Sequence, residues 1–193
     1  DSHCHLDSLD YATRHKNVDE VIDNAKARGV QHLISICTTV GSFEAMKQLT
    51  AHRPEVSLSC GVHPLNVEDE PFDYDRLLAF AQEPRVVAVG ETGLDYHYTP
   101  ETKALQQSLF EQQIDIAKIV KKPLVIHTRS AREDTMQFLE KGHAEQCGGV
   151  LHCFTEDWNM AKRALDLGFY ISISGIITFR NAEELRDVVR KVP

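Results

Sequence analysis

Residues 86–91, VVAVGE, place a run of β-branched and small apolar residues directly before a glutamate. A short apolar run of this composition is typical of a strand that is buried on both faces of a parallel sheet. The interior of such a strand has to be apolar, so a carboxylate is expected only where the strand ends. Glu91 is therefore predicted to lie at the C-terminal end of a buried strand.

Five similar apolar runs surround this one in the sequence. They are QHLISICTTV (31–40), VSLSCGV (56–62), PLVIHT (123–128), GGVLHC (148–153) and FYISISG (169–175). Amphipathic segments lie between them, so a strand begins about every 20 to 40 residues, with a predicted helix before the next. Strands that alternate with helices in this way are parallel, and such units either wind on both faces of a sheet or close into a barrel.

The predicted helices carry recognisable end signals. Three cap residues stand three positions before a glutamate, and these are Asn17, Ser130 and Asn181. The glycines expected to end helices are Gly29, Gly142 and Gly168. An apolar stripe at helical spacing, which predicts a helix packed on the core, consists of Leu185, Val188, Val189 and Val192.

Size and composition limit the class of protein. The 193 residues, of which 42% are apolar, suit a single globular domain. No apolar run approaches the roughly 20 residues that span a bilayer, so no membrane association is expected. The five cysteines are an odd number without a Cys-x-x-Cys pair, which favours reduced thiols and a cytoplasmic location. The net charge of −8 disfavours general electrostatic attraction to nucleic acid, so a phosphate-bearing substrate would need local cations or metal ions.

The histidines gather where predicted strands end. Those at or just past such an end are His5, His63, His127 and His152. His3 shares a face with His5 if this stretch is extended, because side chains alternate along a strand. Active sites of barrels and open α/β sheets form at this edge, and imidazoles with a carboxylate suit a divalent transition metal that activates water. The histidines expected to be solvated are His15, His32, His52 and His143, and His97 is left unassigned.

Several motifs, in order along the whole chain, resemble the signatures of the TatD family of metal-dependent deoxyribonucleases in the amidohydrolase superfamily. They are DSHCHLD (1–7), CGVHPL (60–65), VGETGLDY (89–96), VIHTR (125–129), GVLHCFT (149–155) and ISISGIITF (171–179). The resemblance implies a TIM-type (β/α) barrel. It also implies a cytoplasmic phosphodiesterase that requires Mg²⁺ or another divalent ion such as Zn²⁺ or Mn²⁺.

The resemblance further implies a site for two metal ions. His3 and His5 with Glu91 would hold one ion, and Glu91, acting as a bridge, would hold the second together with His127 and His152. Two ions about 3.5 to 4 Å apart can clamp the attacking and leaving oxygens of a phosphodiester and lower the pKa of a bridging water.

Three other residues complete the predicted catalytic set with Glu91. His63 and Asp95 match family motif positions, and we expect them to support the ligands or to contact the substrate. Arg129, two residues past His127, is a candidate for a bidentate phosphate contact. Its alternative is a salt bridge with Glu133 or Asp134 on the following predicted helix.

The count of strands departs from the family pattern. If residues 1–7 cap strand one, then 169–175 is strand seven, and no ETDSPYL-like segment occurs to supply strand eight and its metal-binding aspartate. We therefore expect residues 1–193 to be one barrel domain, truncated before the eighth strand and incomplete at the N-terminus too.

Three classes of function are compatible with these features. The favoured one is hydrolysis of DNA phosphodiesters by a monomer, as an endonuclease or an exonuclease. The second is hydrolysis of a small ester or amide, or of an aminoacyl-tRNA as in a D-aminoacyl-tRNA deacylase. The third is a noncatalytic metal-binding or scaffold protein. Many amidohydrolases bridge their two metal ions with a modified lysine. The run VVAVGE contains no lysine, so Glu91 as the bridge argues against an ordinary amidohydrolase.

Overall fold

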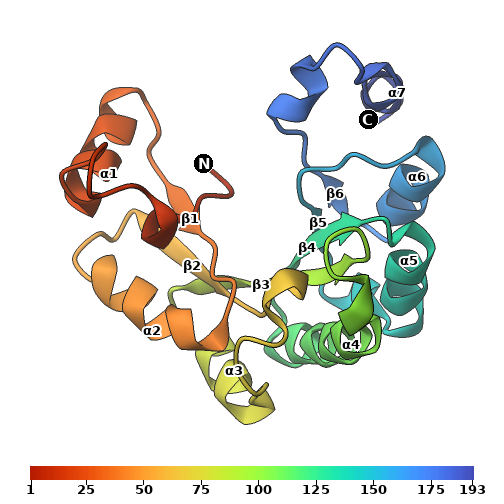
Figure 1. Cartoon of the computed structure of the whole chain (residues 1–193), viewed down its shortest axis with the longest axis horizontal. Coiled ribbons are helices and arrows are strands. Elements are labelled where there is room, and N and C mark those ends of the chain that lie inside the picture. The colour runs from red at the N-terminus through yellow and green to blue at the C-terminus, as the bar shows by residue number, and fades with distance from the viewer.

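The computed structural model describes residues 1–193 and contains one parallel sheet of six strands in sequential order (Figure 1). The strands are β1 (Leu33–Ser35), β2 (Val56–Cys60), β3 (Val86–Asp95), β4 (Leu124–Arg129), β5 (Gly149–Leu151) and β6 (Tyr170–Ile171). Each pair of neighbouring strands is parallel. All six apolar runs thus form strands, as predicted.

Seven α-helices connect and follow the strands. They are α1 (Val18–Ala27), α2 (Val40–Leu49), α3 (Tyr74–Ala81), α4 (Lys103–Val120), α5 (Arg132–Lys141), α6 (Trp158–Asp166) and α7 (Glu183–Val189). Figure 1 shows the sheet curling so that helices cover its outer face and β1 and β6 face each other across an opening. This curled half-barrel confirms the TIM-type fold, and it excludes a sheet with helices on both faces.

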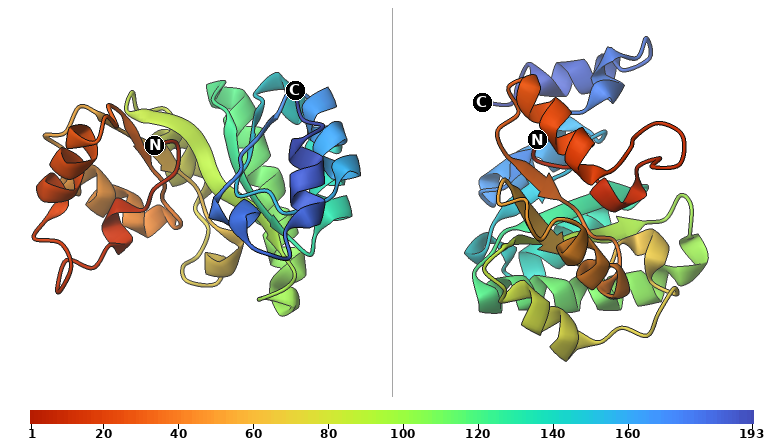
Figure 2. Two further views of the ribbon diagram at one scale, coloured as in Figure 1. Left: turned by 90° about the horizontal axis from the view of Figure 1, so that it is seen from above. Right: turned by 90° about the vertical axis from the view of Figure 1, so that its left-hand side faces the viewer.

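The long strand β3 is the centre of this arrangement. In Figure 2 the elements β1, β2, α1 and α2 lie on one side of it, and β4, β5 and β6 with their helices lie on the other. Short 3-10 helices follow several strands or helices, namely η1 (Leu6–Ser8), η2 (Pro64–Asn66), η3 (Pro100–Thr102), η4 (Ala144–Gln146) and η5 (Gly175–Thr178).

Residues 1–5 lie along the free edge of β1. The Cys4 amide donates to the Ile34 carbonyl at 3.1 Å, and the Ile36 amide donates to the Cys4 carbonyl at 2.8 Å. Cys4 and Ser35 form a single parallel bridge. The segment that carries His3 and His5 is therefore extended and occupies the place expected for the end of strand one.

The core lies between the sheet and its outer helices. Its largest fully buried side chains include Phe43, Met46, Phe110, Ile114 and Phe154. The stripe predicted for the last helix is confirmed, because Leu185 and Val188 are buried and the other two valines are half-buried or in contact with the core.

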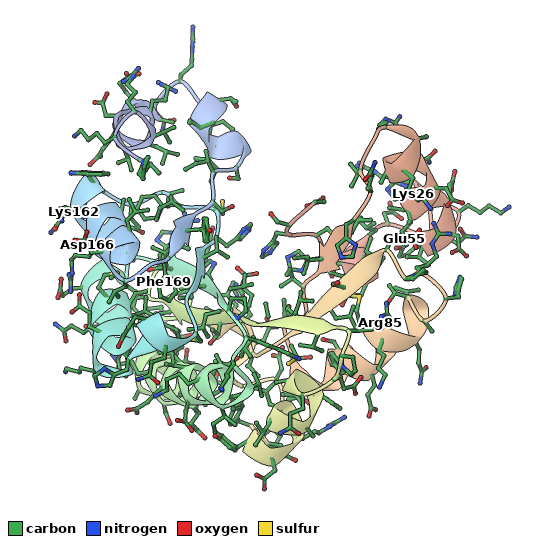
Figure 3. All side chains as sticks on the ribbon, turned by 180° about the vertical axis from the view of Figure 1, so that it is seen from behind. Lys26, Glu55, Arg85, Lys162, Asp166 and Phe169 are labelled. Carbon is green, nitrogen blue, oxygen red and sulfur yellow. The ribbon has the colours of Figure 1, made fainter.

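The outer surface is polar. Ion pairs join Lys26 to Glu55 at 3.4 Å and Lys162 to Asp166 at 2.6 Å, whereas Phe169 is buried at the start of β6 (Figure 3). Arg85 ties the ends of α2 and β2 together by donating to the carbonyls of Thr50 and Val56. None of the helices is long and apolar enough to cross a membrane.

Only one of the three predicted N-terminal caps is correct. The side chain of Asn17 accepts the Glu20 amide at 2.9 Å and caps α1. Ser130 has φ of 52°, in the left-handed region, because the chain turns there directly after β4, and it caps nothing. Asn181 is also wrong as a cap, since α7 begins after Ala182 and no side chain caps it.

The predicted helix ends agree better with the structure. Gly29 and Gly168 follow α1 and α6 with φ of 89° and 79°. Gly142 does end α5, but the left-handed residue there is His143, with φ of 54°.

Candidate metal centre

Strand β3 is irregular where it carries Glu91. Its register against β4 shifts between Gly90 and Thr92, and the Glu91 amide donates to the Cys37 carbonyl at 3.2 Å. A side chain at Gly90 would collide with the backbone oxygen of Val125, and φ there is 140°, so glycine is required. Bulges of this kind re-aim side chains next to active sites. The glycine before Glu91 is thus what allows the irregular strand to pack against β4.

Glu91 lies in the middle of the histidine cluster and is only 4% exposed. Its Oε2 is 3.2 Å from His3 Nε2, and its Oε1 is 3.6 Å from His127 Nδ1. Burial would raise the pKa of Glu91, but the adjacent side chains of His127 and His3 hold that pKa far below its usual range. Glu91 is therefore a carboxylate whose two oxygens face two different groups of histidines.

The first group is His3 and His5. Their Nε2 atoms are 3.2 Å apart, and with Glu91 they form a set of donor atoms that all lie within 4.8 Å of one another. His5 Nδ1 is 3.0 Å from the Ile36 carbonyl. A carbonyl only accepts, so Nδ1 carries the proton and His5 Nε2 has a free lone pair. His5 thus has the tautomer that a ligand needs.

The second group contains His127, which Asp95 orients. His127 Nε2 donates to Asp95 Oδ2 at 2.9 Å, so Nδ1, on the side of Glu91, has the free lone pair. Burial would lower the pKa of His127, but the adjacent carboxylates of Glu91 and Asp95 raise it. Burial would raise the pKa of Asp95, and its hydrogen bonds from Tyr98 and His127 lower it. A carboxylate behind a ligating imidazole is the usual support in metal sites.

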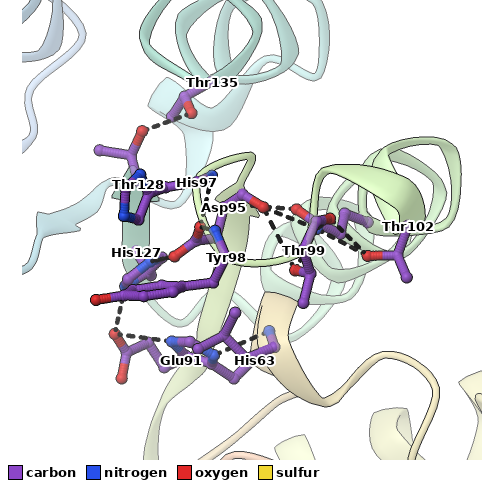
Figure 4. Close-up of polar contacts among 12 residues, drawn as sticks. His63, Glu91, Asp95, His97, Tyr98, Thr99, Thr102, His127, Thr128 and Thr135 are labelled. Atoms are coloured by element: carbon purple, nitrogen blue, oxygen red, sulfur yellow. Dashed lines mark hydrogen bonds and ion pairs between the residues drawn. The ribbon is translucent and has the colours of Figure 1, made fainter. Parts of the chain in front are cut away.

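His63 also approaches Glu91, but with its other tautomer. Its Nε2 is 3.7 Å from Glu91 Oε1, and its Nδ1 accepts the Leu65 amide at 3.1 Å (Figure 4). Burial lowers the pKa of His63 to about 4, so the ring is neutral and its single proton is on Nε2. Although His63, Glu91 and His127 lie close enough to hold an ion, His63 presents a donor there. This arrangement fits the predicted role in support or substrate contact.

His152 lies against the ring of His3. The two rings stack with centroids 3.3 Å apart and planes 5° apart. Burial lowers the pKa of His152 to about 4, which leaves it neutral and able to ligate. It lines the same cavity as Glu91 and His127 but is not part of their close donor set. Its predicted place beside Glu91 and His127 stays a prediction.

These residues line a cavity of about 300 Å³ at the C-terminal ends of the strands. The lining consists of His3, His5, His63, Glu91, His127, Thr128, Arg129, His152, Cys153, Thr155 and Ile176. The cavity gathers seven of the eight predicted site residues, and Asp95 lies behind His127. Imidazole nitrogens and an ionised carboxylate are a donor set that fits divalent ions such as Zn²⁺ or Mn²⁺.

Arg129 lies at the rim of the cavity without an ion pair. The expected alternative partners are engaged elsewhere, because Glu133 binds Arg163 at 2.8 Å and Asp134 binds Lys103 at 2.9 Å. The alternative salt bridge is therefore wrong. The guanidinium lies instead over the ring of Tyr98, 4.8 Å from its centroid. Its donors remain free for a ligand in the cavity.

The other histidines do not line the cavity. His32, His52 and His143 are exposed, as predicted, whereas His15 is half-buried beside Tyr11. His97, which the sequence left unassigned, is exposed on the loop after β3.

Sequence reasoning missed two residues near the cavity. Cys153 lines it, with Sγ 2.9 Å from Ser174 Oγ, and Tyr98 lies under Arg129 at its rim. The adjacency of Cys153 to His152 was a usable signal. Nothing in the local pattern pointed to Tyr98, because a tyrosine in a loop is unremarkable until the fold places it.

Comparisons with known proteins agree on one family. A profile of the TatD related DNase family matches residues 1–193. The metal-dependent hydrolase YcfH of Escherichia coli, described as uncharacterised, is 54% identical over 193 residues, which are 100% of this chain and 72% of that protein. The 3'-5' ssDNA/RNA exonuclease TatD of Salmonella typhimurium is 31% identical over 92% of this chain and 69% of that protein.

Solved structures show the same fold. The crystal structure of the TatD homologue YJJV from Escherichia coli superimposes with a TM-score of 0.89 at 28% identity. The match covers 100% of this chain and 74% of that chain. A TatD family hydrolase from Entamoeba histolytica matches with a TM-score of 0.84 at 24% identity, over 100% of this chain and 69% of that one.

Proposed function

We propose, from the premise that this chain belongs to the TatD related DNase family and is a metal-dependent hydrolase, that it hydrolyses phosphodiester bonds in DNA. The observation that carries the proposal is the bridging position of Glu91. Its two carboxylate oxygens face separate groups of imidazoles, as in sites where one carboxylate holds two cations together.

The residues divide between the two proposed ion positions. His3, His5 and Glu91 would hold one ion, and Glu91, His127 and His152 would hold the other. When bound, two divalent ions supply Lewis acidity and an activated water, which are the requirements of phosphodiester cleavage. Mg²⁺ is the ion we propose for the cell, although the imidazole donors also suit Zn²⁺ and Mn²⁺.

Two side chains beside the proposed ligands have supporting roles, since Asp95 orients His127 and His63 provides a hydrogen-bond donor. Asp95 holds His127 by a 2.9 Å hydrogen bond and keeps Nδ1 free for ligation. His63 is neutral and directs Nε2–H into the cavity, where it can donate to Glu91 or to a phosphate oxygen of the substrate. A donor there stabilises negative charge that develops on that oxygen in the transition state.

Arg129 supplies the local positive charge that an acidic protein needs to bind a phosphate. The net charge is −8, so the overall field does not attract nucleic acid. A guanidinium at the rim of the cavity, with no carboxylate partner, can bind a phosphate with two parallel hydrogen bonds. We assign Arg129 to the phosphate next to the scissile bond.

The substrate and location complete the proposal. One relative carries the name of a 3'-5' ssDNA/RNA exonuclease, which supports a nucleic-acid strand as the substrate. All five cysteines are free thiols, which supports a reducing compartment such as the cytoplasm. The protein is proposed to act as a monomer.

The test uses the full-length protein and a fluorescently labelled oligodeoxynucleotide. We expect hydrolysis with added Mg²⁺, Mn²⁺ or Zn²⁺, complete loss in chelator, and recovery when metal is restored. A protein that leaves the oligonucleotide intact under all three ions but hydrolyses an aminoacyl ester would contradict the nuclease proposal and support deacylation.

A further inference from the structure

The loop between β3 and α4 presents two aromatic side chains beside the cavity. Tyr98 is 59% exposed, and its neighbour His97 is exposed as well. The two rings meet edge to face, with centroids 4.7 Å apart and planes 79° apart. An exposed aromatic ring beside the cavity can make contact with a ligand that binds there.

Tyr98 differs from its neighbour Tyr96, which has a structural role. The Tyr96 hydroxyl donates to Asp134 at 2.8 Å and accepts from Gln107, and this side chain is half-buried. Tyr98 has no comparable anchoring in the core. Its ring meets that of His97 and lies under the guanidinium of Arg129. Tyr98 is thus available to a ligand, whereas Tyr96 is not.

The loop that carries Tyr98 is held in place by Asp95. One oxygen of this fully buried carboxylate accepts the amides of His97 and Tyr98, both at 2.9 Å. The other oxygen accepts from the proposed ligand His127, as Figure 4 shows. The position of the Tyr98 backbone is therefore fixed relative to the metal centre.

Buried Gln106 secures the same loop from below. Its amide nitrogen donates to the carbonyls of Asp95 and Thr99 at 2.9 and 2.8 Å, and its oxygen accepts the Asp95 amide. A binding surface on such a loop is ordered before the ligand arrives, so little entropy is lost on binding. The backbone that carries Tyr98 is thus already ordered for contact with a ligand.

Arg129 connects this surface to the cavity. Its guanidinium both lines the cavity and lies 4.8 Å from the Tyr98 ring centroid. A phosphate bound by Arg129 would consequently lie next to the tyrosine ring. In a nucleic-acid strand, the group beside a phosphate is a nucleoside with a flat base.

Resting on the proposed function, we infer that Tyr98, with His97 at its edge, is a shelf on which a nucleobase next to the scissile phosphate stacks. Base stacking on aromatic side chains is tolerant of sequence and suits a strand whose bases are unpaired. It also supplies affinity that an acidic protein of net charge −8 does not obtain from its overall field. The shelf sets a preference for single-stranded ends over duplex.

The test compares how fast the full-length protein hydrolyses a strand that carries its bases and a strand with abasic residues. Hydrolysis is measured for a short oligodeoxynucleotide and for the same strand with abasic residues next to the cleaved bond. We expect Tyr98→Ala to raise KM for the base-bearing strand roughly 5- to 150-fold, the range that one stacked base is worth. The variant should abolish the advantage of the base-bearing strand over the abasic one, and Tyr98→Phe should retain it.

A second readout needs no turnover. 2-Aminopurine, placed at successive positions of a strand with phosphorothioate linkages, loses fluorescence when it stacks. We expect quenching at the position next to the cleaved bond in the wild type and in Tyr98→Phe, and its loss in Tyr98→Ala. Ile119→Ala is the control, since Ile119 is 53% exposed on the helix α4 and does not line the cavity.

The outcomes separate the shelf from the nuclease activity. If the wild type cleaves DNA and Tyr98→Ala shows the same KM and the same quenching, the shelf is wrong and the nuclease stands. If the wild type neither binds nor cleaves any strand, both proposals are overturned.

Discussion

The two sides of Glu91 are built from similar imidazoles on very different supports. His3 and His5 belong to a segment at the free edge of the sheet, joined to β1 by a single bridge between Cys4 and Ser35. His127 belongs to β4, which pairs with β3 along its whole length from Leu124 to Arg129 and with β5 on its other side. The first side depends on a few local bonds, and the second is part of the centre of the sheet.

The difference extends to what holds each ring. His5 donates to a backbone carbonyl, whereas His127 donates to the fully buried carboxylate of Asp95. A charged acceptor makes the stronger hydrogen bond and raises the basicity of the ligand. Equivalent chemistry in the two donor sets therefore does not imply equivalent preorganisation. We expect the His127 side to be the tighter of the two.

The largest effect is expected where the two sides meet. Glu91→Gln removes the shared negative charge, so the cations separate or one position empties. Each tenfold loss of rate corresponds to about 1.4 kcal/mol of transition-state stabilisation, and we expect at least about a hundredfold loss of hydrolysis. The far-UV circular dichroism should match the wild type. A variant with more than half the wild-type rate at saturating metal would show that Glu91 is not a ligand.

Asp95→Asn probes the His127 side alone. The amide group can turn an N–H toward His127 Nε2, which favours the tautomer with its proton on Nδ1 and so blocks ligation. We expect metal affinity at this side, measured by calorimetry with Zn²⁺, to fall about 10- to 100-fold. Asp166→Asn, on the outer surface of α6, is the control. Unchanged metal affinity in Asp95→Asn would mean that Asp95 does not orient a ligand.

Titration of Zn²⁺ or Mn²⁺ into residues 1–193 tests the comparison directly. We expect the position of Glu91, His127 and His152 to fill first. The position of His3 and His5 should bind the metal ion at least about tenfold more weakly. Metal affinity depends on the number of deprotonated ligands and on how firmly they are held in place. His3→Ala should remove only the weaker equivalent. If two metal ions bind with similar affinity, the segment with His3 and His5 holds its ligands as firmly as β4 does.

The smallest effect is expected at Arg129, which we propose acts on substrate and not on metal. The ammonium group of a lysine cannot bind a phosphate through two parallel hydrogen bonds as a planar guanidinium can. Arg129→Lys should therefore raise KM for an oligonucleotide about three- to tenfold. Metal content should be unchanged. If metal affinity falls while the kinetics at saturating metal are normal, Arg129 supports the metal centre and does not bind phosphate.

The sheet was predictable because its signal is local. Each strand is a run of β-branched residues, and a polar residue such as Glu91 or His127 marks the end of a run whose interior must be apolar. The gathering of the histidines followed from parallel topology alone. The family motifs added the assignment of roles.

The remaining features depend on contacts that a sequence pattern does not contain. The tautomer of His63 is set by the Leu65 amide, and the stacking of His152 on His3 joins residues at distant positions in the chain. The cap predicted at Ser130 failed because the turn after β4 takes up that residue. The role proposed for Tyr98 depends on β4 placing Arg129 over its ring.

The order of the strands in the sheet has a consequence for how the protein is made. Because spatial order follows sequence order, each βα unit leaving the ribosome can dock on the unit that preceded it, without waiting for a distant partner. The nascent chain can thus grow its barrel wall one unit at a time. His3 and Glu91 have both been translated when β3 is complete, whereas His127 follows only with β4, after α4. The proposed ligands are therefore translated in order, and those of the more firmly supported side come last.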